Sequence, residues 1–290
     1  MAKIAVELRE ALQAKRRNGA SGGATSRILG EGDGWRVADI LCTSGPDDRP
    51  FEERHAMLSV SLVAAGTFQY RTAKHGQLMA PGSILFGRPG MAYECAHEHG
   101  SGDRCIAFFF EPDWFERATG TAPRFLTSRV PPMRETSSLI ANACAKLEGI
   151  DGASWEELAV MAAARGAQLA NEANVDAQPP ANAVAKVARA VRIIERHADA
   201  ALSLDSLAAD ARLSPYHFLR TFARVAGITP HQFALRQRLR AAAMRLAQGD
   251  ERVLDVALDS GFGDLSNFTR TFRAEFGASP RAWRDGIMAR

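Results

Sequence analysis

The sequence predicts a two-domain α+β protein in which a strand-rich domain precedes an all-helical one. Short apolar runs separated by PG, RPG and GSGD between Trp35 and Glu111 are typical of a small β-barrel or sandwich. After Trp114 the apolar residues recur at helical spacing, and from about Ala185 to the end the pattern predicts helices throughout. The polar, Pro-containing stretch NEANVDAQPPANA at residues 171–183 marks the boundary between the two parts.

These features divide the 290 residues into four parts, and the length suits two modest domains. We expect residues 1–34 to form an N-terminal arm and residues 35–172 to form a strand-rich domain that ends in two helices. Residues 173–184 are the expected linker, and residues 185–290 are the expected helical domain.

Composition indicates an ordinary globular protein, with 46% hydrophobic and 24% charged residues. No apolar run approaches the roughly 20 residues of a membrane-spanning helix. The N-terminus lacks the apolar segment of a secretory signal, so we expect a cytoplasmic protein with no membrane partner. Because Cys42, Cys95, Cys105 and Cys144 form no CxxC pair, they are expected to be reduced thiols.

Local signals predict the elements of the strand-rich domain. The stretch HEHGSGD is expected to be the loop of a β-hairpin whose arms are AYECAH and RCIAFFF. The first helix after the strands is predicted from RETSSLIANACAKLEG, whose apolar residues fall on one face. The second begins at a capping box, in which Ser154 and Glu157 satisfy each other's backbone amides.

Proline and glycine punctuate the helical domain. Ser214-Pro215, Thr229-Pro230 and Ser279-Pro280 each supply an N-cap hydroxyl followed by a proline at the first helical position, where its missing N–H costs nothing. Gly249 and Gly261 stand where a helix is expected to end in a left-handed residue.

Charge is distributed unevenly between the domains. From Lys186 to the end there are 17 Lys and Arg against 11 Asp and Glu, a net charge of +6, whereas the rest of the chain carries −3. Of those 17 basic residues 16 are arginine, whose planar guanidinium suits phosphates and base edges. A solvated helix face would carry such charges too, but their confinement to one domain points to a polyanionic partner.

One apolar and basic pattern occurs twice in the helical domain. The string FLRTF at 218–222 and the string FTRTF at 268–272 are offset by 50 positions, and each is followed at the same distance by Gly and then Pro. Upstream, Leu207-Ala208 aligns with Val256-Ala257 at an offset of 49, so the extra residue falls in the turn Gly261-Phe262-Gly263. Each copy is predicted to be a helix-turn-helix unit whose Phe pair at i and i+4 packs inward.

The two units, joined by the long helix expected in ITPHQFALRQRLRAAAMRLAQG, resemble the AraC/XylS family of bacterial transcription regulators. The second copy, SGFGDLSNFTRTFRAEFGASPRAWR, carries most of the resemblance, which covers about residues 185 to 290. The resemblance implies a regulator that binds double-stranded DNA, with its recognition helices in successive major-groove segments roughly 34 Å apart, and that works with RNA polymerase. Generic helical hairpins without a DNA role are the alternative, and the arginine excess and the doubled unit count against it.

Recognition helices read base edges through residues near their N-termini that point away from the packing Phe residues. The candidate DNA-binding residues are Tyr216, His217, Leu219, Arg220, Leu265, Ser266, Asn267, Thr269 and Arg270. Within that set, the family's base-contacting positions fall on Tyr216, Leu219, Arg220, Leu265, Ser266 and Arg270. Leu219 and Leu265 favour contact with a thymine methyl, or a weaker readout, over hydrogen bonding. Arg220 and Arg270 would alternatively clamp phosphates or form ion pairs within the domain.

The strand-rich domain resembles the cupin-like sensor domain found ahead of this DNA-binding unit in many family members. LMAPGSILFGRPGMAY is similar to the second cupin motif, but Tyr93 stands where metal-binding cupins place a His, and the HxH of the first motif is missing. We therefore expect no enzyme activity at the usual cupin metal. A metal-dependent cupin-fold enzyme with a DNA-tethering domain is the rival interpretation.

A second cluster in the same domain has metal-ligand chemistry. Cys95, His97, His99 and Cys105 surround the expected hairpin tip CAHEHGSGDRC, and two thiolates with two imidazoles suit tetrahedral zinc. The alternative is a polar loop with two inert buried cysteines, because the spacing is not a standard zinc motif.

The resemblance further implies that the sensor domain binds a small-molecule effector inside the barrel, forms a homodimer, or does both. The helices within residues 135–172 are candidates for a dimer contact, and packing onto the barrel is their alternative role. A regulator that binds DNA without a ligand is the second rival. The sequence names neither the effector, the operator and target genes, nor the direction of regulation.

Overall fold

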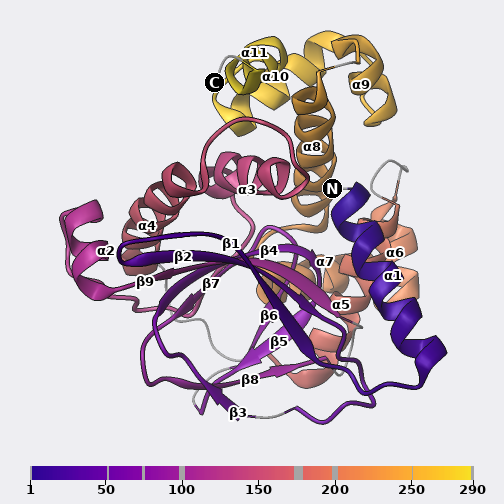
Figure 1. Ribbon diagram of the computed structural model, residues 1–290. Helices are drawn as coiled ribbons and strands as arrows, with labels where there is room; N and C mark the ends of the chain where they lie inside the picture. Colours follow the sequence, from indigo (N-terminus) through magenta and orange to yellow (C-terminus); the bar gives the residue numbers. More distant parts are fainter. Residues whose placement is uncertain are drawn as a thin grey trace.

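The computed structural model describes residues 2–50, 52–73, 76–97, 102–172, 179–197, 202–249 and 251–288. It confirms the two-domain α+β fold, with a strand-rich domain followed by a helical one (Figure 1). Among the described residues, none of the helices is both long and apolar enough to cross a membrane.

Two antiparallel sheets pack face to face and form the barrel of the N-terminal domain. The larger sheet has the order β1 (Ala24–Gly32), β2 (Trp35–Cys42), β9 (Asp103–Phe110), β4 (Leu58–Gly66), β7 (Ile84–Gly87) and β10 (Arg129–Val130). The smaller sheet has the order β3 (Glu52–Arg54), β8 (Ala92–Ala96), β5 (Phe68–Arg71) and β6 (Gly76–Met79). Apolar side chains of both sheets, including Val63, Phe68, Tyr70, Leu85 and Cys105, fill the space between them.

Helices cover the outer face of the larger sheet. Helix α2 (Pro112–Thr119) leads to α3 (Arg134–Leu147) and α4 (Trp155–Glu172), the two helices that the sequence predicts. The capping box is confirmed, because Ser154 and Glu157 exchange hydrogen bonds of 2.8 and 3.1 Å through their side chains and backbone amides. Strand β4 is buried along nearly its whole length because the barrel interior lies on one face and helices on the other.

The first 34 residues do not form a separate arm, which corrects the sequence-based expectation. Helix α1 (Ala2–Asn18) packs on the barrel through Ile4 and Leu8, which are 1% and 5% exposed. Strand β1 pairs with β2 from Ala24 opposite Cys42 to Gly32 opposite Trp35. Charged residues make up much of α1, so its sequence alone did not indicate that it packs on the barrel.

The expected hairpin around HEHGSGD is also wrong. Strand β8 pairs with β3 and β5 in the smaller sheet, whereas β9 pairs with β2 and β4 in the larger one. The two segments therefore cross from one sheet to the other instead of folding back on each other. The two strands are close in sequence, which predicted a hairpin. In the structure they belong to different sheets, and Cys105 and its neighbours are buried between these two sheets.

The helical domain contains two copies of the helix-turn-helix unit, one at each end of a long helix (Figure 1). The first unit is α6 (Leu204–Asp210) and α7 (Pro215–Ala226), preceded by α5 (Ala181–Arg196), and the second is α9 (Val253–Asp259) and α10 (Leu265–Phe276), followed by α11 (Pro280–Met288). Helix α8 (Pro230–Gln248) joins them. Because α5 begins at Ala181, it occupies the last residues of the stretch 173–184 that was expected to be a linker, and residues 173–178 of that stretch lie outside the described residues.

The predicted caps are present. Ser214, Thr229 and Ser279 each accept a hydrogen bond from a backbone N–H in the first turn of the helix that follows, and each is followed by proline. Gly249 and Gly261 have left-handed φ angles of 90° and 79°. In the first unit the residue equivalent to Gly261 is Arg212, which has a φ angle of 53°. Among the residues that the structure describes, Arg212 is the non-glycine residue that has a positive φ. The same turn therefore carries about 1 kcal/mol of backbone strain in the first unit.

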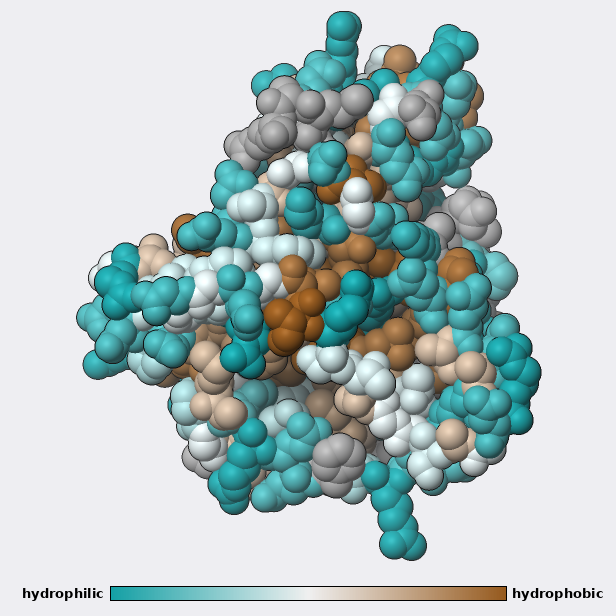
Figure 2. Space-filling view, in the orientation of Figure 1, coloured by the Kyte–Doolittle hydropathy of each residue, from teal (hydrophilic) through white to brown (hydrophobic). Residues whose placement is uncertain are grey.

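Each unit shares a hydrophobic core with the N-terminal domain. The core of the first unit, built on Phe218 and Phe222, includes Leu78 and Ala80 from β6 and the residue after it. The core of the second unit, built on Phe268 and Phe272, is continuous with that of α3. Figure 2 shows that hydrophilic residues cover most of this face of the second unit, and that hydrophobic ones gather near the middle of the molecule, where the sheet meets the helices.

Candidate nucleic-acid interface

The first recognition helix, α7, turns its aromatic residues to the core and its N-terminal residues to solvent. Phe218 and Phe222 are completely buried, whereas Tyr216 is 69% exposed. The guanidinium carbon of Arg220 lies 5.7 Å from the centre of the Tyr216 ring, close enough for a cation–π contact. These two side chains therefore form one outward-facing group beside the turn.

The second recognition helix, α10, has the same division of faces. Phe268 and Phe272 are completely buried, and Leu265 is 39% exposed. Arg270 donates a hydrogen bond of 3.1 Å from Nη2 to Oδ1 of Asn267 on the previous turn. Asn267 therefore orients the arginine along the outer face of the helix.

All nine candidate DNA-binding residues lie on these outer faces. Leu219 and Thr269, which occupy equivalent positions in the two units, are half-buried, and the other seven are exposed. Within the described part of the chain, neither Arg220 nor Arg270 forms an ion pair, so both guanidinium groups keep their charge available for a ligand. The exposed residues are Tyr216, His217, Arg220, Leu265, Ser266, Asn267 and Arg270.

Helix α8 sets the separation of the two outer faces. It has 19 residues and begins at a capping box, in which Thr229 and Gln232 exchange side-chain and backbone hydrogen bonds. At about 1.5 Å per residue its length is about 28 Å, which is near one turn of double-stranded DNA. Trp283 of α11 fastens the second unit to it by donating a hydrogen bond of 3.1 Å to the carbonyl oxygen of Ala243.

The duplicated unit matches known proteins. A family model described as a helix-turn-helix domain matches residues 207–286, which contain both units and α8. This part of the chain is an AraC-type helix-turn-helix domain. We call residues 207–286 the AraC-type domain below.

Curated relatives share this domain. The regulatory protein PocR of Salmonella typhimurium is 32% identical over 117 residues, which are 40% of this chain and 39% of that protein. The transcriptional activator RhaS of Klebsiella pneumoniae is 34% identical over 110 residues, which are 38% of this chain and 40% of that protein. The chain thus spans about two fifths of the length of these relatives.

Solved structures also match. The DNA-binding domain of the transcription factor AdpA in complex with a target DNA is 31% identical, covers 36% of this chain and 94% of its own, and has a TM-score of 0.34. ToxT from Vibrio cholerae is 11% identical, covers 89% of this chain and 100% of its own, and has a TM-score of 0.36. Because both TM-scores are below 0.5, neither likeness bears on how the two domains are arranged here.

The N-terminal domain caps the C-terminal ends of both recognition helices, which the sequence did not predict. Arg129 of β10 donates hydrogen bonds to the carbonyl oxygens of Val225, at 3.1 Å, and Ala226 at the end of α7. Ser138 of α3 donates a hydrogen bond of 3.3 Å to the carbonyl oxygen of Phe276, the residue of α10 that is equivalent to Ala226. Unpaired carbonyls at a helix C-terminus attract such donors, and a cation there also interacts favourably with the helix dipole.

Two arginines of α8 extend this contact. Arg236 donates to Glu275 of α10 at 3.1 Å and to the carbonyl oxygen of Pro132 at 3.0 Å, so it joins the second unit to the N-terminal domain. Arg240 is 2% exposed, and its guanidinium lies against Gly82 at the turn before β7. We call Arg129, Ser138, Arg236 and Arg240 the interdomain clamp.

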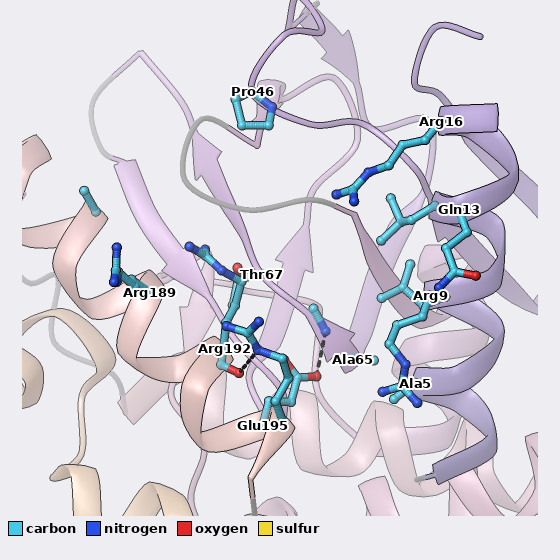
Figure 3. A pocket seen from close by; sticks show the side chains of 15 residues that line it. Ala5, Arg9, Gln13, Arg16, Pro46, Ala65, Thr67, Arg189, Arg192 and Glu195 are labelled. Atoms are coloured by element: carbon cyan, nitrogen blue, oxygen red, sulfur yellow. Dashed lines mark hydrogen bonds between the residues drawn. The ribbon is translucent and has the colours of Figure 1, made fainter. Parts of the chain in front are cut away.

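A cavity of about 720 Å³ lies outside the barrel, between the N-terminal domain and α5. Figure 3 shows Arg9 and Arg16 of α1 facing Arg189 and Arg192 of α5 across it. Glu195 of α5 closes one side by accepting a hydrogen bond of 3.0 Å from the backbone N–H of Gly66, and burial raises the pKa of this carboxyl group. Apolar residues of α1 and β4, among them Leu8, Leu12 and Ala65, also line it.

The sequence-predicted metal candidates are only partly brought together. Cys95 lies on β8 and Cys105 on β9, while His99 lies outside the described residues. Tyr93, at the position where metal-binding cupins have a His, donates a hydrogen bond of 2.8 Å to Glu53. His97 instead meets two residues that the sequence did not single out as ligands, Cys42 and Asp103.

Proposed function

We propose that the chain is a sequence-specific DNA-binding regulator of transcription that acts in the cytoplasm. One observation supports this most strongly: two equivalent helices, at opposite ends of a single capped helix, expose residues at equivalent positions near their N-termini. In this proposal α7 and α10 enter successive segments of the major groove, and α8 fixes the distance between them. The regulators PocR and RhaS, which share the domain, support the transcriptional role.

Selection from random duplexes tests this proposal. The full chain should enrich a composite site with two conserved segments about 10 base pairs apart from centre to centre. Lack of enrichment over the input pool, at a salt concentration that suppresses non-specific binding, would contradict sequence-specific recognition.

Arg270→Ala is expected to weaken binding to the selected site by about 1–3 kcal/mol and to relax preference at one base pair. The reason is that Arg270 is exposed, forms no ion pair and is aimed by Asn267. Arg273→Ala is the matched control, since Arg273 is exposed on the same helix about one turn further from its start. Equal weakening on all sequences would assign Arg270 to phosphate contact and remove it from base readout.

The alternative of a cupin-fold enzyme has less support. The phenol of Tyr93 pairs with Glu53 and its ring stacks on His55 with centroids 4.2 Å apart, so the position of the usual cupin ligand has a packing role. PocR and RhaS, which share the AraC-type domain, are named as regulators.

We also propose that the regulator responds to an organic anion bound in the cavity between α1 and α5. Five arginines line this cavity, and Glu195 is the acidic residue of the lining. One of the five, Arg189, also pairs with Asp210. Guanidinium groups bind carboxylates and phosphates in bidentate fashion, so the lining suits an organic anion. The barrel interior, where the sequence analysis placed the effector, is lined by apolar and aromatic side chains such as Phe68 and Tyr70. A ligand in the cavity would touch both domains and would therefore couple to DNA binding through α5.

Charge reversal on α1 tests the effector site. Citrate, hexanoate and inorganic phosphate should be screened by thermal shift, and an anion that binds the native state raises the melting temperature. We expect Arg9→Glu to abolish that increase and Arg17→Glu to retain it, because Arg17 lies on α1 but does not line the cavity. Equal shifts in both variants would place the anion elsewhere.

Homodimer formation belongs to the same proposal. Helix α3 is occupied by contacts with α8 and α10, whereas α4 exposes Val160 and Met161, which are 41% and 39% exposed. Sedimentation of Met161→Glu against the unmodified chain tests whether α4 holds two copies together, and an unchanged dimer would exclude this face.

A further inference from the structure

Three potential metal ligands meet at one end of the barrel. A thiol sulfur of Cys42, a ring nitrogen of His97 and a carboxylate oxygen of Asp103 all lie within 4.8 Å of one another. Cys42 ends β2 and Asp103 begins β9, and the two residues are directly opposite in the strand register. His97 follows β8 of the other sheet, so the group joins both sheets.

A fourth ligand lies beside them. Cys105 is two residues after Asp103 on β9, so both side chains point to the same face of the strand. Its thiol sulfur is 3.3 Å from Oδ2 of Asp103, and the residue is 5% exposed. Two sulfurs, one imidazole and one carboxylate therefore converge from three segments.

The group is buried and its polar atoms are incompletely paired. His97 is 4% exposed and Asp103 is 5% exposed, and Nε2 of the ring lies 2.6 Å from Oδ1 of Asp103. The other ring nitrogen, Nδ1, has no hydrogen-bond partner among the residues that the structure describes. Nε2, which faces Asp103, is the nitrogen that a cation shared with Asp103 would contact, whereas Nδ1 points away from Asp103 on the other side of the ring.

We propose that Cys42, His97, Asp103 and Cys105 bind one zinc ion that joins the two sheets of the barrel. Sulfur and imidazole ligands select a borderline-soft cation and disfavour calcium and magnesium, which prefer oxygen. Zinc takes four such ligands at about 2.0–2.3 Å in tetrahedral geometry. Ligand atoms of Cys42, His97 and Asp103 already lie within 4.8 Å of one another, and Cys105, which contacts Asp103, would have to turn toward them to complete the site. The proposed zinc site does not rest on the proposed DNA binding. It is connected to the cavity through Gly66, which pairs with Asp103 and donates a backbone hydrogen bond to Glu195.

Metal content of the full chain tests this assignment. The protein is stripped with chelator, loaded with zinc, desalted and measured by mass spectrometry for metals, and we expect one zinc per chain. Cobalt loading should give the near-ultraviolet charge-transfer band of a thiolate ligand and the visible bands of a tetrahedral site.

Variants separate ligation from folding. Cys42→Ser and His97→Gln should each weaken zinc affinity at least ~100-fold, because loss of an outer partner alone costs 10- to 100-fold. Cys144→Ser is the matched control, since Cys144 is buried in α3 away from the group, and it should keep one zinc per chain. Circular dichroism of the metal-free variants checks the fold, and Cys42→Ser, at a half-buried position, is expected to remain folded.

Two results would overturn the proposal. One is less than about a tenth of an equivalent of zinc in folded, loaded protein, which would leave a hydrogen-bonded His97–Asp103 pair as the whole role of the group. The other is retention of the cobalt charge-transfer band in Cys42→Ser together with its loss in Cys144→Ser, which would place the thiolate ligand elsewhere.

Discussion

Phe272→Ala is expected to destabilise the second helix-turn-helix unit by about 3–5 kcal/mol and to abolish specific DNA binding. Phe272 is completely buried, and its ring lies 5.5 Å from that of Phe268, 4.5 Å from that of Phe276 and 6.1 Å from that of Trp283. Removing it leaves a cavity at the centre of the aromatic cluster that seats α10. Denaturant unfolding measures the loss of stability, and fluorescence anisotropy on the selected duplex measures the loss of affinity.

Two further variants serve as controls for Phe272→Ala. Phe222→Ala makes the equivalent change in the first unit and should have a similar effect, because Phe222 is also completely buried. Leu265→Ala removes a side chain that is 39% exposed on α10, so it should change affinity with little change in stability. If Phe272→Ala bound the duplex within about twofold of the unmodified chain, the second unit would have no part in recognition.

Arg129→Ala is expected to lower stability by on the order of 3 kcal/mol and to loosen the first unit from the N-terminal domain. Its guanidinium donates to the carbonyl oxygens of two consecutive residues at the end of α7. Charge-assisted bonds of this kind contribute about 1.5–3 kcal/mol each, and their loss would leave buried carbonyls without a donor. Hydrogen exchange should rise in α7 and in β6, which packs against it.

Arg134→Ala is the matched control, since Arg134 is an exposed arginine at the start of α3. We expect Arg134→Ala to leave hydrogen exchange and stability unchanged. If Arg129→Ala also left exchange in α7 unchanged, the interdomain clamp would not hold the first recognition helix.

The sequence predicted the helical domain well because its signals are local. The Phe pairs at i and i+4, the Ser-Pro and Thr-Pro caps and the one-residue difference in the turn each act within a few residues, so a repeat at 50 positions could be aligned without a structure. Exposure of Tyr216, Leu265 and Arg270 follows directly from burial of the Phe residues on the opposite face.

Features that depend on contacts distant in sequence were missed. Cys42 and Asp103 meet because β2 and β9 pair in a particular register, and no spacing rule connects residues so far apart. The bonds from Arg129 to α7 span nearly a hundred residues between two domains, and its sequence context marks it only as a basic residue. The hairpin expected at HEHGSGD failed for a related reason, since neighbouring strands were assigned to one sheet when burial places them in two.

The distance between the two DNA segments provides a direct test of whether α7 and α10 bind DNA simultaneously. The affinity of the full chain should be measured for the selected duplex and for duplexes with 5 or 10 base pairs inserted between the two segments. A rigid α8 predicts that both insertions reduce affinity to that of a single segment, because the first turns the second segment to the other face of the DNA and the second moves it out of reach. Affinity unchanged by either insertion would contradict simultaneous recognition by α7 and α10.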